Sequence, residues 1–293
     1  MNPDEQSVSR ELRREVDGGQ LAAQVTGSGV PVVLLHGFPH TRAVWDDVTV
    51  RLVPAGCLVV APDLRGIGES EPTETGYDAA TLARDVLGML DALGLPSAHV
   101  VGFDLGAAPA FALATLTPDR VRSLTIVEAA VGGLPGAERL LAGGGPWWFG
   151  FHQAPGGLAE DVVGADAERY VRYFLESGSR RGVPEELAAR FVEAYRGRER
   201  LRAAFEHYRA MPANAAANRA WAARGRLTMP VTTIGAGAVQ DLTARQLAPV
   251  ADDLVEHMLA DAGHIVPVDA PTETAHLILA TIARGESRRP EPA

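Results

Sequence analysis

An aspartate occupies the centre of the most distinctive short motif in this sequence of 293 residues. The motif is Gly102-Phe103-Asp104-Leu105-Gly106, and it follows an apolar run at residues 98–101 that is typical of a buried strand. A strand that enters a Gly-x-nucleophile-x-Gly turn and continues as a helix forms a nucleophile elbow, so sharp that small residues must flank it. Because a carboxylate is already ionised at neutral pH, Asp104 could attack without a base. The motif therefore predicts displacement at a saturated carbon, which leaves an alkyl ester on the enzyme.

A histidine near the other end of the chain could complete this chemistry. His264 closes the segment Asp261-Ala262-Gly263-His264, directly after the last expected strand. An imidazole can deprotonate water as a general base, and that water would hydrolyse the ester. A catalytic histidine needs an acidic partner that orients its ring. The sequence offers two, Glu128 at the end of the sixth expected strand and Asp241 after the seventh.

Strands and helices are expected to alternate around these residues. Apolar runs predict strands at residues 15–17, 21–26, 31–36, 58–61, 99–101, 123–127, 230–235 and 254–259, and other patterns predict helices at residues 41–52, 81–93, 107–116, 184–195 and 272–283. The first two strands are joined by Asp17-Gly18-Gly19, a hairpin signal. Such alternation implies βαβ units and a parallel sheet, with catalytic residues at the carboxyl ends of its strands.

The alternation stops after the sixth strand. Residues 132–226 hold glycine-rich turns, two neighbouring tryptophans and arginine-rich helical segments, after which strands return. We therefore expect one α/β core, made of residues 1–131 and 227–293, with a helical lid of residues 132–226 inserted after the sixth strand. The polar, proline-bearing tail at residues 284–293 is expected to be frayed.

This layout resembles the α/β-hydrolase fold over nearly the whole chain, and two further motifs resemble those of epoxide hydrolases and haloalkane dehalogenases. His36-Gly37-Phe38-Pro39 resembles their oxyanion loop, and Asp63-Leu64-Arg65-Gly66-Ile67-Gly68-Glu69-Ser70 resembles a loop common to both. His264 lies where the family carries its catalytic histidine, after the nucleophile in the chain. The resemblance implies an α/β fold, a mostly parallel sheet flanked by helices, and the subgroup with an aspartate nucleophile that includes epoxide hydrolases and fluoroacetate dehalogenases.

The resemblance also implies roles for the residues around the nucleophile. Many family members carry the acidic partner after the seventh strand, where this chain has Ala238. Related dehalogenases carry it at the position of Glu128, and we favour Glu128 over Asp241. The backbone N–H groups of Phe38 and Leu105 are the expected donors to the oxyanion of the tetrahedral intermediate.

The lid should supply the groups that stabilise the leaving atom. Residues 143–153 resemble the start of the lid in fluoroacetate dehalogenases and their epoxide-hydrolase relatives, in which a tryptophan N–H and a tyrosine hydroxyl hold that atom. Trp148 and Tyr208 match those two positions, and the Tyr208 hydroxyl could protonate the oxygen of an opening epoxide. Trp147 is expected to line the substrate pocket.

Two departures from the family favour an epoxide over a halide. Fluoroacetate dehalogenases carry arginines directly after the nucleophile and three residues further on, where this chain has Leu105 and Ala108. Haloalkane dehalogenases usually carry a tryptophan at the first of these positions. We therefore expect an epoxide hydrolase that forms a vicinal diol from a bulky uncharged or aromatic substrate. The alternatives are a dehalogenase with the same covalent mechanism, and a non-hydrolytic cyclase or a binding protein that uses the same pocket.

Composition argues against several other classes of function. The formal net charge of −10 disfavours a nucleic-acid or anionic-membrane partner, and no apolar stretch approaches the ~20 residues of a membrane span. Residues 1–14 contain no apolar signal region, so we expect a cytoplasmic monomer or homodimer that binds a small-molecule substrate without metal or cofactor. The single cysteine, Cys57, excludes a disulfide framework and fits a buried strand thiol. We interpret His40 and His152 as structural or solvated histidines.

Overall fold

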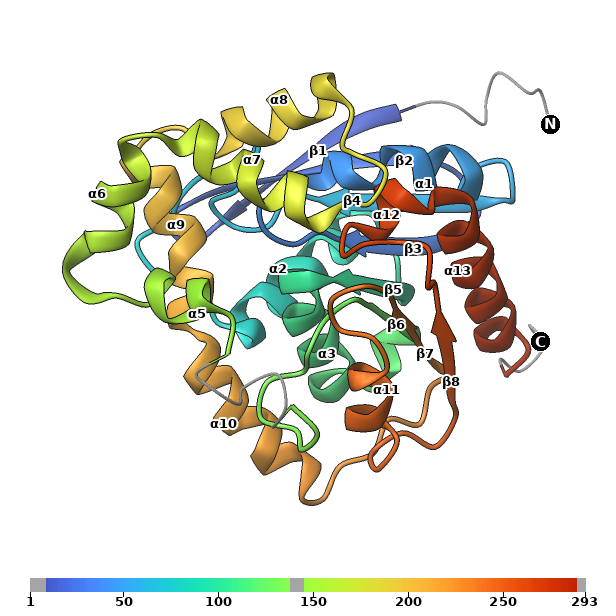
Figure 1. Cartoon of the computed structure of the whole chain (residues 1–293). Coiled ribbons are helices and arrows are strands. Elements are labelled where there is room, and N and C mark those ends of the chain that lie inside the picture. Colours follow the sequence, from blue (N-terminus) through green and yellow to red (C-terminus); the bar gives the residue numbers. More distant parts are fainter. Residues whose placement is uncertain (1–8, 138–144, 289–293) are drawn as a thin grey trace.

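An eight-stranded, mostly parallel sheet forms the centre of the molecule (Figure 1). The computed structural model describes residues 9–137 and 145–288. Within them the strands lie in the order β1-β2-β4-β3-β5-β6-β7-β8. They are β1 (Ser9–Val16), β2 (Gly19–Gly27), β3 (Val30–Leu35), β4 (Cys57–Pro62), β5 (Ala98–Phe103), β6 (Val121–Val127), β7 (Val231–Gly235) and β8 (Leu254–Met258). The pairs β1–β2 and β2–β4 are antiparallel and the later pairs are parallel, which confirms the expected fold class.

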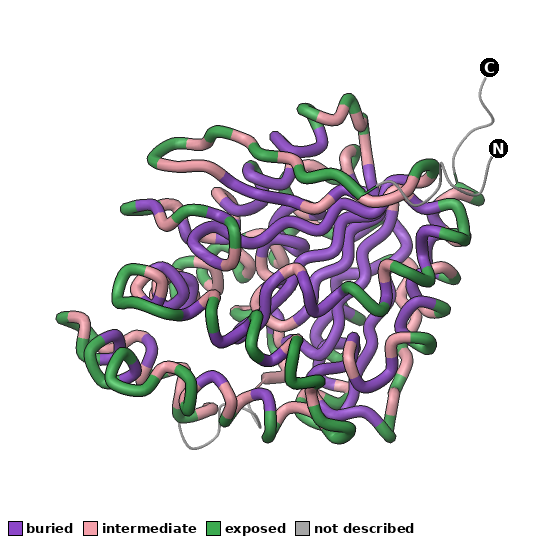
Figure 2. The backbone as a smooth tube through the Cα atoms, turned by 90° about the horizontal axis from the view of Figure 1, so that it is seen from above, coloured by how far each residue is buried: buried purple, intermediate pink, exposed green. Residues whose placement is uncertain are grey.

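Helices cover both faces of this sheet. The core helices are α1 (Asp46–Leu52), α2 (Ala79–Ala92), α3 (Ala107–Leu116), α11 (Leu242–Leu247), α12 (Val266–Asp269) and α13 (Pro271–Glu286). Helices α1 and α13 pack together on one face, and α2 and α3 pack together on the other (Figure 1). Strand β5 is buried along its whole length, and Figure 2 shows buried strands through the middle of the molecule with exposed segments around them. Strands covered on both faces are mostly apolar, which is why apolar runs in the sequence locate them.

The segment between β6 and β7 forms a layer of helices beside the core (Figure 1). Its helices are α5 (Trp147–His152), α6 (Leu158–Gly164), α7 (Ala167–Gly178), α8 (Glu185–Ala194), α9 (Arg198–Arg209) and α10 (Met211–Ala222), and we refer to this layer as the lid. The Tyr195 hydroxyl donates a hydrogen bond to the backbone oxygen of His40, at 3.0 Å. His207 Nε2 lies 3.0 Å from the backbone oxygen of Arg65, so the lid is docked on two loops of the core.

The amino-terminal strand is longer than the sequence suggested. The expected hairpin is present, but β1 begins at Ser9, because its mostly exposed, charged residues pair along the whole of β2. Such a charged edge strand has no apolar alternation by which it could be recognised. Over the described ranges, no helix has the length and apolar composition that crossing a bilayer requires.

The carboxyl-terminal helix also extends further than expected. Helix α13 continues to Glu286, so the expectation of a frayed tail is wrong for residues 284–288. Arg284 and Arg288 both form ion pairs with the Asp253 carboxylate, a contact that a polar composition does not reveal. Residues 289–293 lie outside the described ranges.

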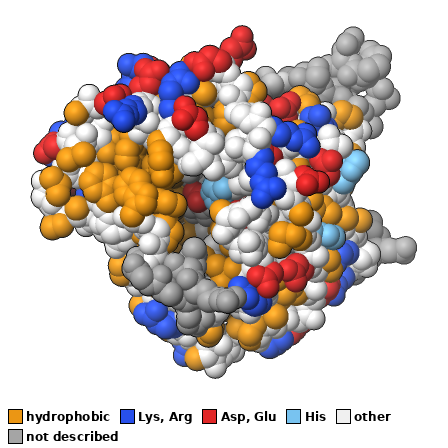
Figure 3. Space-filling view, in the orientation of Figure 1, with side chains coloured by type: hydrophobic (Ala, Val, Ile, Leu, Met, Phe, Trp, Pro, Cys, Tyr) orange, Lys and Arg blue, Asp and Glu red, His pale blue; other side chains and the backbone are white. Residues whose placement is uncertain are grey.

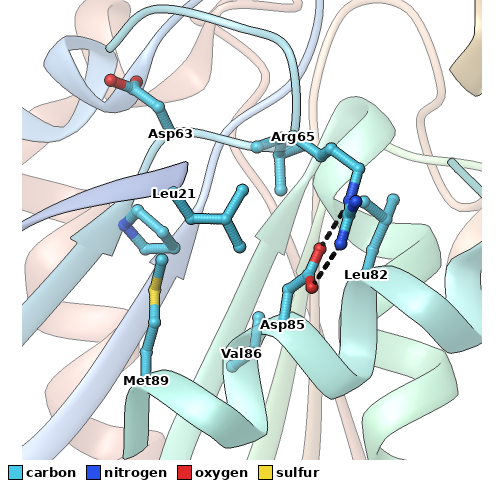
Figure 4. A pocket seen from close by; sticks show the side chains of 9 residues that line it. Leu21, Asp63, Arg65, Leu82, Asp85, Val86 and Met89 are labelled. Carbon is cyan, nitrogen blue, oxygen red and sulfur yellow. Dashed lines mark hydrogen bonds and ion pairs between the residues drawn. The ribbon is translucent and has the colours of Figure 1, made fainter. Parts of the chain in front are cut away.

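The loop after β4 is a structural element of the core. The Arg65 guanidinium donates two hydrogen bonds to the Asp85 carboxylate, at 3.0 and 2.8 Å (Figure 4). Asp63 Oδ1 accepts the backbone N–H of Arg42 at 2.7 Å. Gly68 has a φ of +58°, and a Cβ there would lie 2.5 Å from the Asp63 carboxyl carbon. The cavity lined by Leu21, Asp63, Arg65 and Asp85 has a volume of only about 10 Å³, which is too small for a substrate.

Candidate active site

The turn after β5 presents Asp104 in a strained conformation that only small neighbours permit. Asp104 has a φ of +50°, in the left-handed region that non-glycine residues rarely adopt. A Cβ on Gly102 would lie 2.5 Å from the Gly106 oxygen, and one on Gly106 would lie 2.4 Å from the Leu35 oxygen. A Cβ on Gly37 would lie 2.3 Å from the Asp104 Cβ itself. The glycines of both sequence motifs are therefore needed so that the backbone can approach the aspartate.

Asp104, His264 and Glu128 form a continuous chain of contacts. His264 Nε2 lies 3.2 Å from Asp104 Oδ2, and His264 Nδ1 lies 3.1 Å from Glu128 Oε2. Glu128 is fully buried, whereas the side chains of Asp104 and His264 keep about a quarter of their surface exposed, 25% and 22%. Figure 3 shows a hollow beside the lid in which acidic and histidine side chains are visible. This order of contacts, carboxylate to imidazole to buried carboxylate, is the one that a nucleophile, a base and an orienting acid would require.

Of the two candidate acids, only Glu128 contacts His264. The Glu128 carboxylate also accepts the backbone N–H groups of Ala236, Ala238 and Val239, from the turn after β7. That turn thus supplies hydrogen-bond donors to an acid that comes from β6. Asp241 instead pairs with Arg245 at 3.1 Å, where both side chains are about half exposed.

The carboxylate of Asp104 is held in its ionised form. Its Oδ1 accepts the backbone N–H of Phe38 at 2.8 Å. Burial alone would raise the pKa of Asp104, but hydrogen bonds from His264 and from the backbone N–H groups of Phe38 and Leu105 outweigh burial and lower it. The two backbone groups expected to hold the oxyanion therefore already act on the nucleophile.

The pKa of His264 is raised by its two carboxylate neighbours. Burial opposes the charged imidazolium, but hydrogen bonds and charge interactions with Asp104 and Glu128 dominate and raise the pKa to about 10. At neutral pH the resting site therefore holds an imidazolium between two carboxylates. Loss of the charge on Asp104 would remove one of the interactions that keep this proton in place.

We expect His264 to make the stability of the protein depend on pH. Because the folded state binds the proton more tightly than the unfolded chain, the stabilisation is complete below about pH 6.5 and is lost as the pH rises toward about 10. The measurement is urea unfolding of the wild type and His264→Gln at several pH values between these limits. The difference in unfolding free energy should shrink with rising pH, by a few kcal/mol at most, and a constant difference would contradict the raised pKa.

Tyr208 lies beside the oxyanion loop and close to the nucleophile. It is 2% exposed, and its ring meets the Phe38 ring edge-on with centroids 5.8 Å apart. Burial first, and then the charge of Asp104, raise the pKa of the Tyr208 hydroxyl well above its ordinary value. The hydroxyl therefore stays protonated and can act as a donor.

His152 is a second polar side chain at this place. It is fully buried, so of the two interpretations, structural or solvated, only the structural one fits. Its ring stacks on Phe205 at 4.2 Å and meets the Tyr208 ring at 4.3 Å between centroids. Its Nε2 lies 2.7 Å from the Tyr170 hydroxyl, and its Nδ1 is buried without a partner among the described residues. Burial, and then the charge of Arg209, lower the pKa to about 3, so the ring is neutral.

The two tryptophans lie further out in the lid. Trp148 is half-buried, and its ring contacts among the described residues are with Trp147, Phe149 and Phe174. Trp147 is 53% exposed and lines an outer depression of the lid together with Tyr170. The structure therefore brings the ring of Tyr208 against that of His152, and among the described residues neither tryptophan ring packs on the Tyr208 ring.

His40 is fully buried, close enough to Asp104 and His264 for their charges to act on it. Its ring packs against Phe103 and Phe191, with centroids 5.3 and 5.2 Å away, and both ring nitrogens lack a hydrogen-bond partner in the part of the chain that the structure describes. Burial lowers its pKa to about 3. Of the two interpretations of His40, structural or solvated, the structural one fits. Within residues 9–137 and 145–288, no three His, Cys, Asp or Glu side chains are grouped as metal ligands would be.

The chain is similar in sequence and in structure to known hydrolases. A family model described as the alpha/beta hydrolase fold matches residues 30–280. A soluble epoxide hydrolase of Corynebacterium sp. is 28% identical over 272 residues, which cover 87% of this chain and 91% of that protein. A fluoroacetate dehalogenase of Burkholderia sp. is 33% identical over 167 residues, 54% of each chain. The solved structure of the epoxide hydrolase CorEH without ligand has a TM-score of 0.85 and 27% identity, and the match covers 94% of this chain and 99% of that one.

Proposed function

Because this chain belongs to the α/β-hydrolase fold family, we propose that it is an epoxide hydrolase in which Asp104 is the nucleophile and His264 the general base. The observation that carries the proposal is the chain of contacts from Asp104 through His264 to Glu128. The similarity to a soluble epoxide hydrolase over most of both chains supports the choice of substrate class. The proposed product is a vicinal diol.

In the proposed first step, Asp104 Oδ2 attacks a carbon of the epoxide ring and the bond from that carbon to the ring oxygen breaks. The carboxylate is ionised and needs no activation. The released oxygen takes a proton from the Tyr208 hydroxyl. An alkyl ester of Asp104 and the anion of Tyr208 result.

Formation of the ester then prepares the base. The ester carries no charge, so one of the interactions that raise the pKa of His264 is lost. His264 can then release its proton, which restores the hydroxyl of Tyr208. The neutral ring, oriented by Glu128, takes a proton from water as that water attacks the ester carbonyl carbon. As the tetrahedral intermediate collapses, the second proton of that water passes from the added hydroxyl to the departing alkoxide oxygen. The diol is released, and the aspartate and the imidazolium are regenerated.

The backbone of the two turns stabilises the intermediate of this second step. The Phe38 N–H already lies 2.8 Å from Asp104 Oδ1, the oxygen that becomes the oxyanion. The Leu105 N–H acts on the same carboxylate. Donors that are in place before the charge develops are worth about 2.7–4 kcal/mol each in such sites.

We propose that His152 assists Tyr208 as the second polar group beside the ring oxygen. The contact of its ring with Tyr208, its neutral state and its unpartnered Nδ1 support this role over Trp148. If the Tyr170 hydroxyl donates to Nε2, the single proton of the neutral ring lies on Nδ1 and can be donated to the substrate.

The aromatic surroundings of Phe38 support an apolar substrate. The side chains whose rings contact the Phe38 ring are His152, Phe174, Tyr195, Phe205 and Tyr208. At the two positions where fluoroacetate dehalogenases carry arginines, Leu105 and Ala108 pack against the apolar core. A bulky uncharged or aromatic epoxide therefore fits better than a haloacid, whose carboxylate would lack a cation at these positions.

We expect Tyr208→Phe to slow ring opening about ten- to a hundredfold and to leave ester hydrolysis unchanged, because the hydroxyl acts only in the first step. The measurement is rapid-quench mass spectrometry of the alkylated enzyme with styrene oxide as the probe. Tyr195→Phe is the matched control, since this buried hydroxyl is already bonded to the His40 oxygen, and it should leave ring opening near the wild-type rate. An unchanged alkylation rate in Tyr208→Phe would show that another group protonates the oxygen.

A further inference from the structure

A buried carboxylate joins the loop of His264 to the lid. Asp269 ends α12, the short helix that directly follows the His264 loop, and it is fully buried. Its Oδ2 accepts the backbone N–H groups of Gly263, at 2.6 Å, and of Arg180, at 2.8 Å. Its Oδ1 accepts the Ser179 hydroxyl at 2.5 Å and the backbone N–H of Arg181 at 3.2 Å. One carboxylate therefore binds the residue before His264 and three consecutive residues of the lid.

Other contacts join the same two segments. The backbone N–H of Ile265 donates to the Gly178 oxygen at 3.0 Å, and Arg180 Nη1 donates to the Ala260 oxygen at 2.7 Å. A Cβ on Gly263 would lie 2.4 Å from the Gly178 oxygen and 3.0 Å from Asp269 Oδ2. The residues on both sides of His264 are thus in direct contact with the connection between α7 and α8.

The contact between the His264 loop and the connection from α7 to α8 depends on the hydrogen bonds that the Asp269 carboxylate accepts. No ion pair to Asp269 exists within the described residues, so its four hydrogen bonds are what compensate the burial of the carboxylate. An amide of the same shape would turn N–H groups toward at least one of these donors. Since the loop that carries His264 lies beyond the last strand, the lid connection is a main lateral support for it.

We propose that Asp269 is a positioning residue for His264, and that it makes the lid part of the support that keeps the imidazole between Asp104 and Glu128. The catalytic consequence rests on the proposed function, in which His264 activates water. The position of the ring does not depend on that function. A base displaced by about 1 Å loses on the order of a hundredfold in rate, so the hydrolytic step should depend on Asp269 more than alkylation does.

The first experiment measures the position of His264 without any substrate. The ring is titrated by NMR in protein with ¹⁵N-labelled histidine, and its signal is assigned by its absence from His264→Ala. The titratable groups that face this ring are Asp104, Glu128 and His40. In Asp269→Asn we expect the pKa of His264 to fall by at least about one unit, because the ring leaves its carboxylate neighbours.

Asp85→Asn is the matched control for loss of a buried carboxylate. Asp85 binds Arg65 in the core (Figure 4), and its hydrogen bonds and ion pair among the described residues are with Arg65 and not with the His264 loop. It should lower the stability of the protein while it leaves the titration of His264 and both chemical steps at their wild-type values. Ser179→Ala removes one hydrogen-bond donor, on the lid side only. We expect it to lower the pKa of His264 by less than Asp269→Asn does.

A second experiment resolves the two chemical steps in single turnovers with styrene oxide. Asp269→Asn should hydrolyse the ester at least about tenfold more slowly and alkylate at nearly the wild-type rate. A folded Asp269→Asn with the wild-type titration of His264 would overturn the proposal. If that variant does not fold, an unchanged titration in Ser179→Ala overturns it instead. If the wild type forms no ester with the epoxide, the proposed function is in question, while the titration still decides the role of Asp269.

Discussion

Replacement of Asp104 by asparagine should abolish turnover, with a fall in kcat of at least about a thousandfold. The amide has nearly the shape of the carboxylate, so its oxygen can still accept the Phe38 N–H that now binds Oδ1. It carries no charge and is a very weak nucleophile, so no alkyl ester can form. The measurement is diol formation from a panel of epoxides by freshly prepared protein.

Two comparisons make this result specific. Asp241→Asn changes the other candidate acid, which is exposed and paired with Arg245, and it should retain wild-type activity. Activity that appears slowly in Asp104→Asn on storage would indicate deamidation back to aspartate. Full activity in the fresh variant would rule out the covalent mechanism.

Replacement of His264 by alanine should trap the enzyme as its ester. Alkylation uses the ionised Asp104 and the Tyr208 hydroxyl, which this variant keeps, whereas hydrolysis needs a base, so we expect the second step to slow by at least about a thousandfold. Intact-protein mass spectrometry after exposure to a mixed panel of epoxides and haloalkanes is the measurement. The expected adduct has the mass of a whole epoxide and is absent when Asp104 is also replaced.

The mass of the adduct also separates the alternative functions. An adduct that lacks the elements of hydrogen halide would identify a dehalogenase. If no adduct forms with either the epoxides or the haloalkanes, the result would favour the cyclase or the binding protein that uses the same pocket. Hydrolysis at the normal rate in His264→Ala would remove His264 as the base.

The sequence predicts most of the core, because each of its determinants is local. A buried parallel strand can be apolar without interruption, as in β3, and a nucleophile elbow needs glycines on both sides of Asp104. Each of these constraints leaves a pattern in a few consecutive residues, although a Cβ on Gly106 would meet Leu35, which lies far earlier in the chain. The fold class and the positions of the central strands along the chain could therefore be predicted from the sequence.

The site residues that the sequence did not identify depend on contacts between distant segments. His152 looks like one more aromatic residue of the lid until α5 and α9 pack together and place its ring against Tyr208. In the sequence Asp269 looks like an ordinary aspartate at the end of a helix. The lid residues that donate hydrogen bonds to it lie about ninety residues earlier in the chain. Motif comparison could point to Trp148 by its position, but it could not show which side chain would face Tyr208.

The two oxygens of Asp104 are bound by different groups, and this determines which of them is exchanged during catalysis. Oδ1 is bound to the Phe38 N–H, while Oδ2 faces His264. Under the proposed mechanism Oδ2 leaves in the diol, and the water that replaces it arrives from the side of the imidazole. Oδ1 therefore remains in the polypeptide, whereas Oδ2 is transferred to the product and replaced by an oxygen from water in every cycle. At that one atom the enzyme is a reagent as well as a catalyst.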